Sequence, residues 1–100
     1  MFVYNVTIGI DPDIEKEWIS WMKSHHIPKI MDTGLFSDYK FFRVLHDNED
    51  GTLSFSIQYA TSSIEKVQRY LDEFAPSLVE EHRNRFKDRH VAFRTLLQEV

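Results

Sequence analysis

The stretch that decides the fold, WISWMKSHHIPKIMDTGL, occupies residues 18–35. It holds two tryptophans, two adjacent histidines, a proline and a threonine–glycine turn. Upstream, Asp11-Pro12 is typical of a helix start, with the aspartate as N-cap and the proline in the first turn. We expect Pro28 to interrupt this helix, because proline cannot donate a backbone hydrogen bond. Gly34 should then end the segment in the left-handed conformation.

Side chains suited to burial recur along this first helix at helical spacing. They are Ile14, Trp18, Trp21, Met22 and His25. A single stripe of this kind is typical of a helix that packs one face against a core. After the proline, a second short helical turn is expected at residues 29–31.

Four stretches have the two-residue periodicity or the apolar content of β-strands. They are residues 2–10, 39–46, 53–59 and 90–97. The adjacent Phe41 and Phe42 leave the inward face of the second strand undecided. Asp50-Gly51 predicts a hairpin connection between the second and third strands.

A second helical stripe follows the third strand. Its members are Ile64, Val67, Leu71, Phe74, Leu78, His82 and Phe86. Either Thr61 or Ser62 would cap this helix, and Glu65 lies three residues after Ser62 as in a capping box. Pro76 falls inside the stripe and predicts a kink, or two helical pieces, near residues 74–77.

The order strand, helix, strand, strand, helix, strand predicts one ferredoxin-like α+β domain over residues 1–100. Its four-stranded antiparallel sheet should have the order 4-1-3-2, with both helices on one face. The other face is expected to carry Asn5, Thr7, Ser54, Ser56, Gln58 and Arg94. We expect Val3 and Leu96 to add apolar side chains to that face. One of two alternative sets from the second strand should join them, either Phe42 and Val44 or Tyr39, Phe41 and Leu45. Such a mixed face suits sheet-to-sheet dimerisation.

Composition excludes several classes of protein. The net charge of −4 does not provide the basic face that nucleic-acid binding requires. The absence of cysteine excludes disulfides, thiolate catalysis and cysteine-type zinc fingers. Neither a signal peptide nor an apolar run of about 20 residues, the length that spans a bilayer, is present. We therefore expect a cytoplasmic protein that binds neither nucleic acid nor membrane.

The chain resembles a bacterial family of about this length that is known only as a domain of unknown function. The resemblance is carried by MFVYNVTIGID, EKEWISWMKSHHIPKIMDTGLF, FSIQYATSS, EFAPSLVEEHRNRF and VAFRTLLQEV. These segments run almost from end to end of the chain. No activity is established for that family, so the resemblance implies kinship alone.

The segment EKEWISWMKSHHIP is also similar to the helix-to-loop segment of dimeric α+β barrel proteins. That superfamily includes antibiotic-biosynthesis monooxygenases, muconolactone-isomerase-like proteins and ether-degradation-associated proteins. The corresponding residues here are Trp21, His25, His26, Pro28, Gly34 and Phe36. The resemblance implies a homodimer with two sheets face to face, and a small cleft between the sheet and the helices of each subunit.

His25 is the candidate catalytic residue, as a general acid or base at the mouth of such a cleft. Tyr4, Trp18 and Trp21 would line the cleft and His26 would contribute a polar group. The alternative is structural: the tryptophans belong to the core, and each histidine ring packs at the helix end and bonds to a carbonyl group.

Arg43 and Arg94 stand inside apolar strands, where an arginine needs a partner or a polar cavity. If both face the open side of the sheet, they could bind an anionic small molecule or form salt bridges across a dimer. His25 and His82 should lie far apart, because the two helices run antiparallel, so no metal site is expected. No glycine-rich phosphate loop or cofactor fingerprint is present, and no cofactor is expected.

Two functions remain open. The first is a homodimeric small-molecule-binding or interaction module. The second is a cofactor-independent enzyme, similar to a monooxygenase or isomerase, that acts on a small aromatic or planar substrate with His25 as base. RNA binding by the open sheet face is disfavoured because the basic charge and an exposed aromatic platform are lacking.

Overall fold

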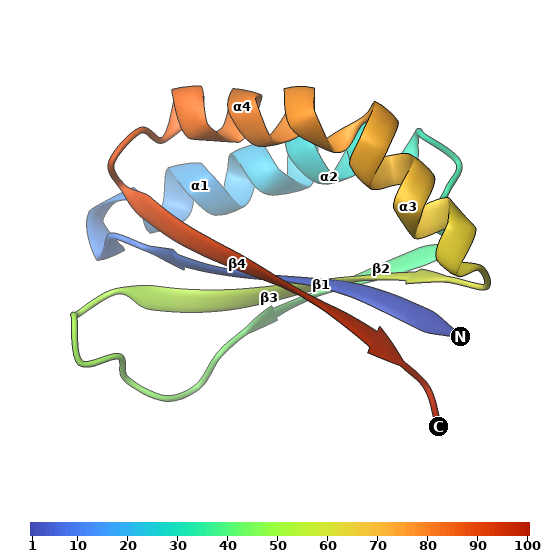
Figure 1. The fold of residues 1–100 in the computed structure, drawn as a ribbon. Coiled ribbons are helices and arrows are strands. Elements are labelled where there is room, and N and C mark those ends of the chain that lie inside the picture. Colours follow the sequence, from blue (N-terminus) through green and yellow to red (C-terminus); the bar gives the residue numbers. More distant parts are fainter.

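The computed structural model describes residues 1–100. Helices cover one face of a four-stranded sheet and leave the opposite face open (Figure 1). The strands are β1 (Phe2–Ile10), β2 (Asp38–Arg43), β3 (Leu53–Thr61) and β4 (His90–Gln98). Their spatial order is β2-β3-β1-β4, and every neighbouring pair is antiparallel. The predicted ferredoxin-like fold and its sheet order are confirmed.

The first helical segment runs through Pro28 without a break, so the predicted interruption is wrong. Its pieces are the 3-10 turn η1 (Pro12–Ile14), α1 (Glu15–Trp21), the π-helical turn η2 (Met22–His26) and α2 (Ile27–Met31). In η2 the amide of Ile27 donates to the carbonyl oxygen of Met22, five residues back. This wider turn lies directly before the proline, whose missing amide and bulky ring an α-helical turn would not accommodate.

The π turn also changes which residues face the core. Five of the buried residues follow one another at steps of four: Ile14, Trp18, Met22, His26 and Ile30. Ile27 is buried beside them. In a regular α-helix a four-residue step rotates the side chain by about 40°, so the stripe would drift around the helix. The wider π turn rotates each residue by a smaller angle, so the stripe of buried side chains returns to the face that packs against the core. His26 is therefore buried, whereas the predicted His25 is partly exposed.

The second helical segment divides as the proline predicts, into α3 (Ile64–Glu73) and α4 (Ala75–Arg85). Pro76 lies in the first turn of α4, where its missing amide has no cost. Ser63, rather than Thr61 or Ser62, is the N-cap of α3. Its hydroxyl donates to the Glu65 carboxylate at 2.7 Å, and the reciprocal bonds of a capping box are absent.

The connections contain the two turns that glycine was expected to make. Gly34 has φ +75° and Gly51 has φ +80°, both in the left-handed region that glycine adopts without strain. Strand β2 ends at Arg43, three residues before the predicted end. The longer β2–β3 connection leaves Leu45 exposed.

Strand register assigns each side chain to a face. Phe41 pairs with the buried Ile57 and faces the helices, so Phe42 points to the open face. Arg94 pairs with Val6 and Leu96 pairs with Tyr4, which places both on the helix side. The predictions that Arg94 and Leu96 lie on the open face are wrong. Both faces of the nine-residue strand β4 mix polar and apolar residues in the sequence, so its pairing with β1 decides which side chains face the helices.

The open face carries several exposed apolar side chains. They are Phe42, Val91, Phe93 and Leu97. Polar groups lie between them on the central strands, where the Ser56 hydroxyl donates to Asn5 Oδ1 at 2.6 Å. On the helix side, 19 apolar residues form a single core. None of the helices is both long and apolar enough to cross a membrane.

Candidate functional site

A cavity of about 190 Å³ lies between the helix side of the sheet and the helical layer. Its walls come from β1, β3 and β4 on one side and from η2, α2, α3 and α4 on the other. The polar side chains that line it are Tyr4, Tyr59, Tyr70, His26, His82, His90, Arg83 and Arg94. No carboxylate lines the cavity. The site is therefore rich in hydrogen-bond donors and cations for a chain of net charge −4.

His26 enters the cavity wall from the π turn. Its side chain is buried, and Nδ1 has no hydrogen-bond partner in the protein. Burial is the main cause that lowers the pKa of His26 to about 4, against the opposing charge of Glu81. The ring is thus neutral at neutral pH. A buried polar atom without a partner is costly and unusual, and π turns are frequent at functional sites.

His82 reaches the same region from α4. Its Nε2 accepts a hydrogen bond from Trp18 Nε1 at 3.0 Å, so in the neutral ring Nδ1 carries the proton. Burial, followed by the charges of His90, His26 and Arg94, lowers the pKa of His82 to about 3. The ring centroids of His82 and His26 are 5.5 Å apart, and those of His82 and His90 are 4.4 Å apart.

His90 completes this group of three rings. Its Nδ1 lies 2.9 Å from the Phe86 carbonyl oxygen. A carbonyl oxygen only accepts, so Nδ1 donates and Nε2 is left as an acceptor in the neutral ring. Of the three rings, those of His26 and His82 thus supply neutral hydrogen-bonding groups rather than fixed charges.

The expectation that His25 and His82 lie far apart is wrong. The carboxylate of Glu81, the residue before His82, lies 2.9 Å from His25 Nε2. The helix continues past Pro28, so the two histidines of the first helical segment sit near its middle rather than at its end. The C-termini of two antiparallel helices lie at opposite ends of the pair, but residues near the middles of the two helices lie side by side.

Arg94 extends from β4 on the cavity side. Its Nε donates to the Tyr4 hydroxyl at 3.1 Å. Burial raises the pKa of Tyr4, and the charge and hydrogen bond of Arg94 oppose that rise. Burial also raises the pKa values of Tyr59 and Tyr70. All three phenols are therefore neutral and able to donate hydrogen bonds.

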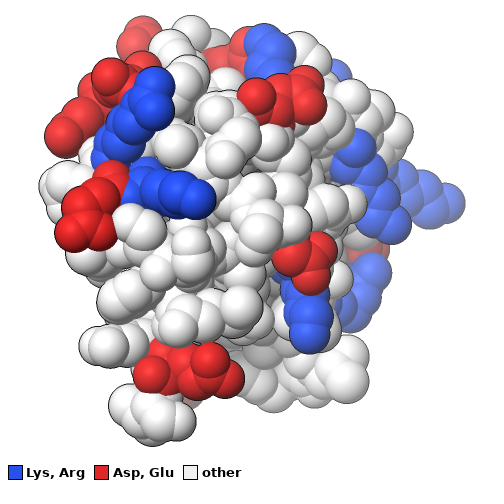
Figure 2. Space-filling model, turned by 90° about the vertical axis from the view of Figure 1, so that its right-hand side faces the viewer, with Lys and Arg blue, Asp and Glu red and all other residues white.

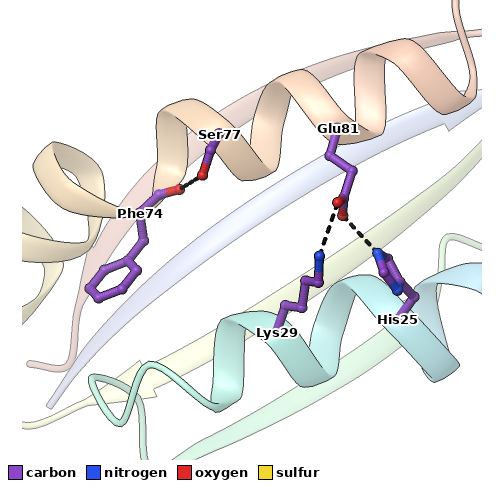
Figure 3. A network of polar contacts seen from close by, with 5 residues as sticks. All are labelled: His25, Lys29, Phe74, Ser77 and Glu81. Carbon is purple, nitrogen blue, oxygen red and sulfur yellow. Dashed lines mark hydrogen bonds and ion pairs between the residues drawn. The ribbon is translucent and has the colours of Figure 1, made fainter.

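His25 lies outside the cavity lining. Its ring and the ammonium of Lys29 both reach the Glu81 carboxylate, with Lys29 Nζ 3.0 Å from Oε2, and together they join α2 and η2 to α4 (Figure 3). The three side chains are 35–47% exposed. In this structure the His25 ring forms a contact between two helices. Its catalytic role stays a prediction.

The remaining predicted residues are dispersed. Trp18 is fully buried in the core, and the ring of Trp21 packs against those of His25 and His26. Arg43 lies on β2, at the opposite sheet edge from Arg94, where it pairs with Glu15 and covers the Phe55 ring. Of the predicted site residues, the cavity brings together Tyr4, His26 and Arg94.

Sequence reasoning missed His90, Tyr59 and Tyr70, and it left His82 out of the site. Tyr59 could have been found, because a β1–β3 pairing places it directly opposite Tyr4 on the helix side. The start of β4 at His90 agrees with the prediction, but the face on which His90 lies depends on its pairing with Ile10, which the sequence did not show.

The structure holds no set of three or more histidine, cysteine or acidic side chains placed to bind a metal ion. On the side of the molecule drawn in Figure 2, acidic and basic side chains are interspersed among uncharged ones.

Solved structures share this architecture at low sequence identity. An ethyl tert-butyl ether degradation family protein from Bacillus halodurans superposes with a TM-score of 0.68 at 14% identity, covering 100% of both chains. A dimeric ferredoxin-like protein from an uncultured marine organism gives 0.64 at 15% identity, covering 99% of this chain and 97% of that one.

A mutant form of SnoaB from Streptomyces nogalater, a cofactor-independent oxygenase, gives a TM-score of 0.61 at 11% identity and covers 98% of this chain and 92% of its own. At these identities the likeness shows the fold alone. No curated protein sequence matches the chain. The family comparison goes further, because one family matches over residues 1–100. The chain therefore belongs to the family described as Domain of unknown function (DUF4286).

Proposed function

We propose that this protein is a homodimer that binds a small planar molecule in the cavity between its sheet and its helices. The observation that carries the proposal is the buried Nδ1 of His26, which lacks a protein partner on a side chain that lines the cavity. A ligand that offers a hydrogen bond there would satisfy this atom and offset the cost of burying it.

The size of the cavity supports a ligand with one aromatic ring. An apolar cavity of about 150 Å³ is known to bind benzene. The present cavity of about 190 Å³ leaves room for one substituent on such a ring. Aromatic side chains already surround the space, with the rings of Tyr4 and Tyr70 at 5.6 Å and those of Tyr4 and Tyr59 at 6.2 Å.

The open sheet face supports the dimer. Phe93 and Val91 are each 63% exposed there, and Phe42 and Leu97 extend the apolar surface. Apolar side chains gathered on one side of a sheet are typical of an interaction surface, and a second copy is the commonest partner of such a face. A dimeric ferredoxin-like protein shares this fold.

Ligand-observed NMR with a set of planar single-ring fragments tests the binding function. We expect fragments to bind the wild-type protein and to compete with one another. Ala92 lines the cavity, so Ala92→Trp should fill it and abolish binding. Ser77→Trp, on the exposed side of α4, is the control and should leave binding unchanged. Absence of fragment binding, or equal binding to the Ala92→Trp protein, would contradict the proposal.

Sedimentation velocity tests the dimer. The wild-type protein should sediment as a dimer, and Phe93→Lys should give a folded monomer, because two charges would be buried at the centre of the apolar face. Leu45→Lys removes an apolar side chain that is 90% exposed in the β2–β3 connection and should leave the dimer intact. A monomeric wild-type protein would contradict this half of the proposal.

A further inference from the structure

We propose that the ligand of this cavity is a planar monocarboxylate of about the size of benzoate, with its carboxylate bound to Arg94. This inference rests on the proposed function and names the class of ligand that the same cavity selects.

The pairing of the arginines carries the inference. The chain has six arginines. Four of them form ion pairs with carboxylates: Arg43, Arg69, Arg85 and Arg89. The two that pair with no carboxylate, Arg83 and Arg94, both line the cavity. In a chain with an excess of acidic residues, the unpaired guanidinium groups are thus gathered at one place.

The contacts of Arg94 leave its binding edge free. Its Nε donates to the hydroxyl of Tyr4, whose side chain is buried and 4% exposed. This bond fixes the orientation of the guanidinium plane and occupies none of the four terminal N–H groups. The two terminal nitrogens form the planar fork that binds a carboxylate through two parallel hydrogen bonds.

The rest of the lining is compatible with an anion. It contains no acidic side chain. Glu80 lines, with Arg83 and Arg94, an open depression that adjoins the cavity, but it is not among the carboxylates that form ion pairs. Since His26 and His82 are buried in their neutral form, the fixed positive charges of the wall are those of the two arginines. This favours an anionic ligand, and the fork of Arg94 suits one carboxylate.

The apolar residues of the wall favour an aromatic ring as the uncharged part of the ligand. Val6, Ile57, Met22 and Val79 line the cavity together with the three tyrosines. These side chains would exclude water from an aromatic ring while the carboxylate points toward the exposed end of Arg94.

Isothermal titration calorimetry with benzoate and benzamide tests the inference, because the two probes share size and shape and differ in charge. We expect benzoate to bind the wild-type protein at least tenfold more tightly than benzamide. Arg94→Gln should weaken benzoate binding by about ten- to hundredfold, as expected for a hydrogen-bonded charge pair, and leave benzamide unchanged. Arg94→Lys should give an intermediate affinity, because it keeps the charge and loses the fork.

Arg43→Gln is the matched control, since it removes the same charge at the opposite sheet edge and should not alter either affinity. Equal affinity of the wild-type protein for benzoate and benzamide would overturn the inference while leaving the cavity a binding site. Unchanged benzoate affinity in the Arg94→Gln protein would overturn it equally. If neither probe binds, and the fragment set also fails to bind, the proposed function fails as well.

Discussion

The indole of Trp18 and the imidazole of His82 are joined by a buried hydrogen bond of 3.0 Å between residues 64 positions apart in the chain. It ties the first helical segment to α4 directly beside the cavity wall. Trp18 is fully buried, and its ring also packs edge-on against His82 at a centroid distance of 6.4 Å. The bond fixes the tautomer of His82 and so determines which nitrogen can serve a ligand.

Replacing Trp18 with phenylalanine should lower the free energy of unfolding by about 2–4 kcal/mol. The loss has two causes: the buried Nε2 of His82 is left without a donor, and the smaller ring leaves a void. Urea unfolding followed by circular dichroism measures the change. A double-mutant cycle with His82→Phe isolates the pair, and a coupling energy near zero would show that the bond does not stabilise the fold.

Stability should fall as the pH decreases below neutrality, because two histidines are buried in their neutral form. The pKa values of His26 and His82 are lowered to about 4 and about 3, whereas unfolded histidine titrates near 6.5. Between about pH 6.5 and those folded values the unfolded state binds more protons. Each ring then costs up to about 1.4 kcal/mol of stability per pH unit.

Urea unfolding at pH 7.5, 6.5, 5.5 and 4.5 measures this dependence. His82→Gln should reduce the slope between pH 6 and 5 by the contribution of one ring. His46→Gln changes a histidine on an exposed connection and should leave the slope as it is. An unaltered slope in the His82→Gln protein would show that His82 is protonated alike in both states.

Glu81→Gln should lower the free energy of unfolding by less than about 1 kcal/mol, although it breaks contacts with two side chains. The carboxylate and its partners His25 and Lys29 are 35–47% exposed, and water and salt weaken ion pairs of that kind. The measurement is the free energy of unfolding at low and at high salt, and the small difference should shrink further at high salt. A loss above 2 kcal/mol would mean that this contact holds the helices together.

Gly34→Ala should lower the free energy of unfolding by about 1 kcal/mol through backbone strain alone. Gly34 has φ +75°, and no atom lies within 4 Å of the position that an added Cβ would take. Gly34→Asn is the control and should cost less, because asparagine tolerates the left-handed region. Equal losses in thermal or urea unfolding would point to a cause other than backbone conformation.

The sequence predicts the fold well because its periodic patterns are strong and local. Strands β1 and β3 alternate over nine residues each, and Pro76 divides the second helical segment as expected. Sheet order then follows from chain connectivity. These features depend on neighbouring residues, so no long-range information is needed to find them.

The candidate site was predicted less well because it depends on one turn and one register. The π turn before Pro28 buries His26 in place of His25, and a pattern based on α-helical spacing cannot show this change. Arg94 moves to the cavity side through the pairing of β4 with β1. Neither the burial of His26 in place of His25 nor the face on which Arg94 lies changes the fold. Together, however, they determine which side chains meet in the cavity.

The most direct test of the account is the ¹⁵N spectrum of the histidine rings recorded with and without saturating benzoate. If the cavity is the ligand site, the ring nitrogens of His26 should shift, with smaller shifts at His82. Those of His46, on the exposed connection, should not. Shifts at His46 alone, or a spectrum unchanged at saturating benzoate, would contradict the claim that this cavity binds the ligand.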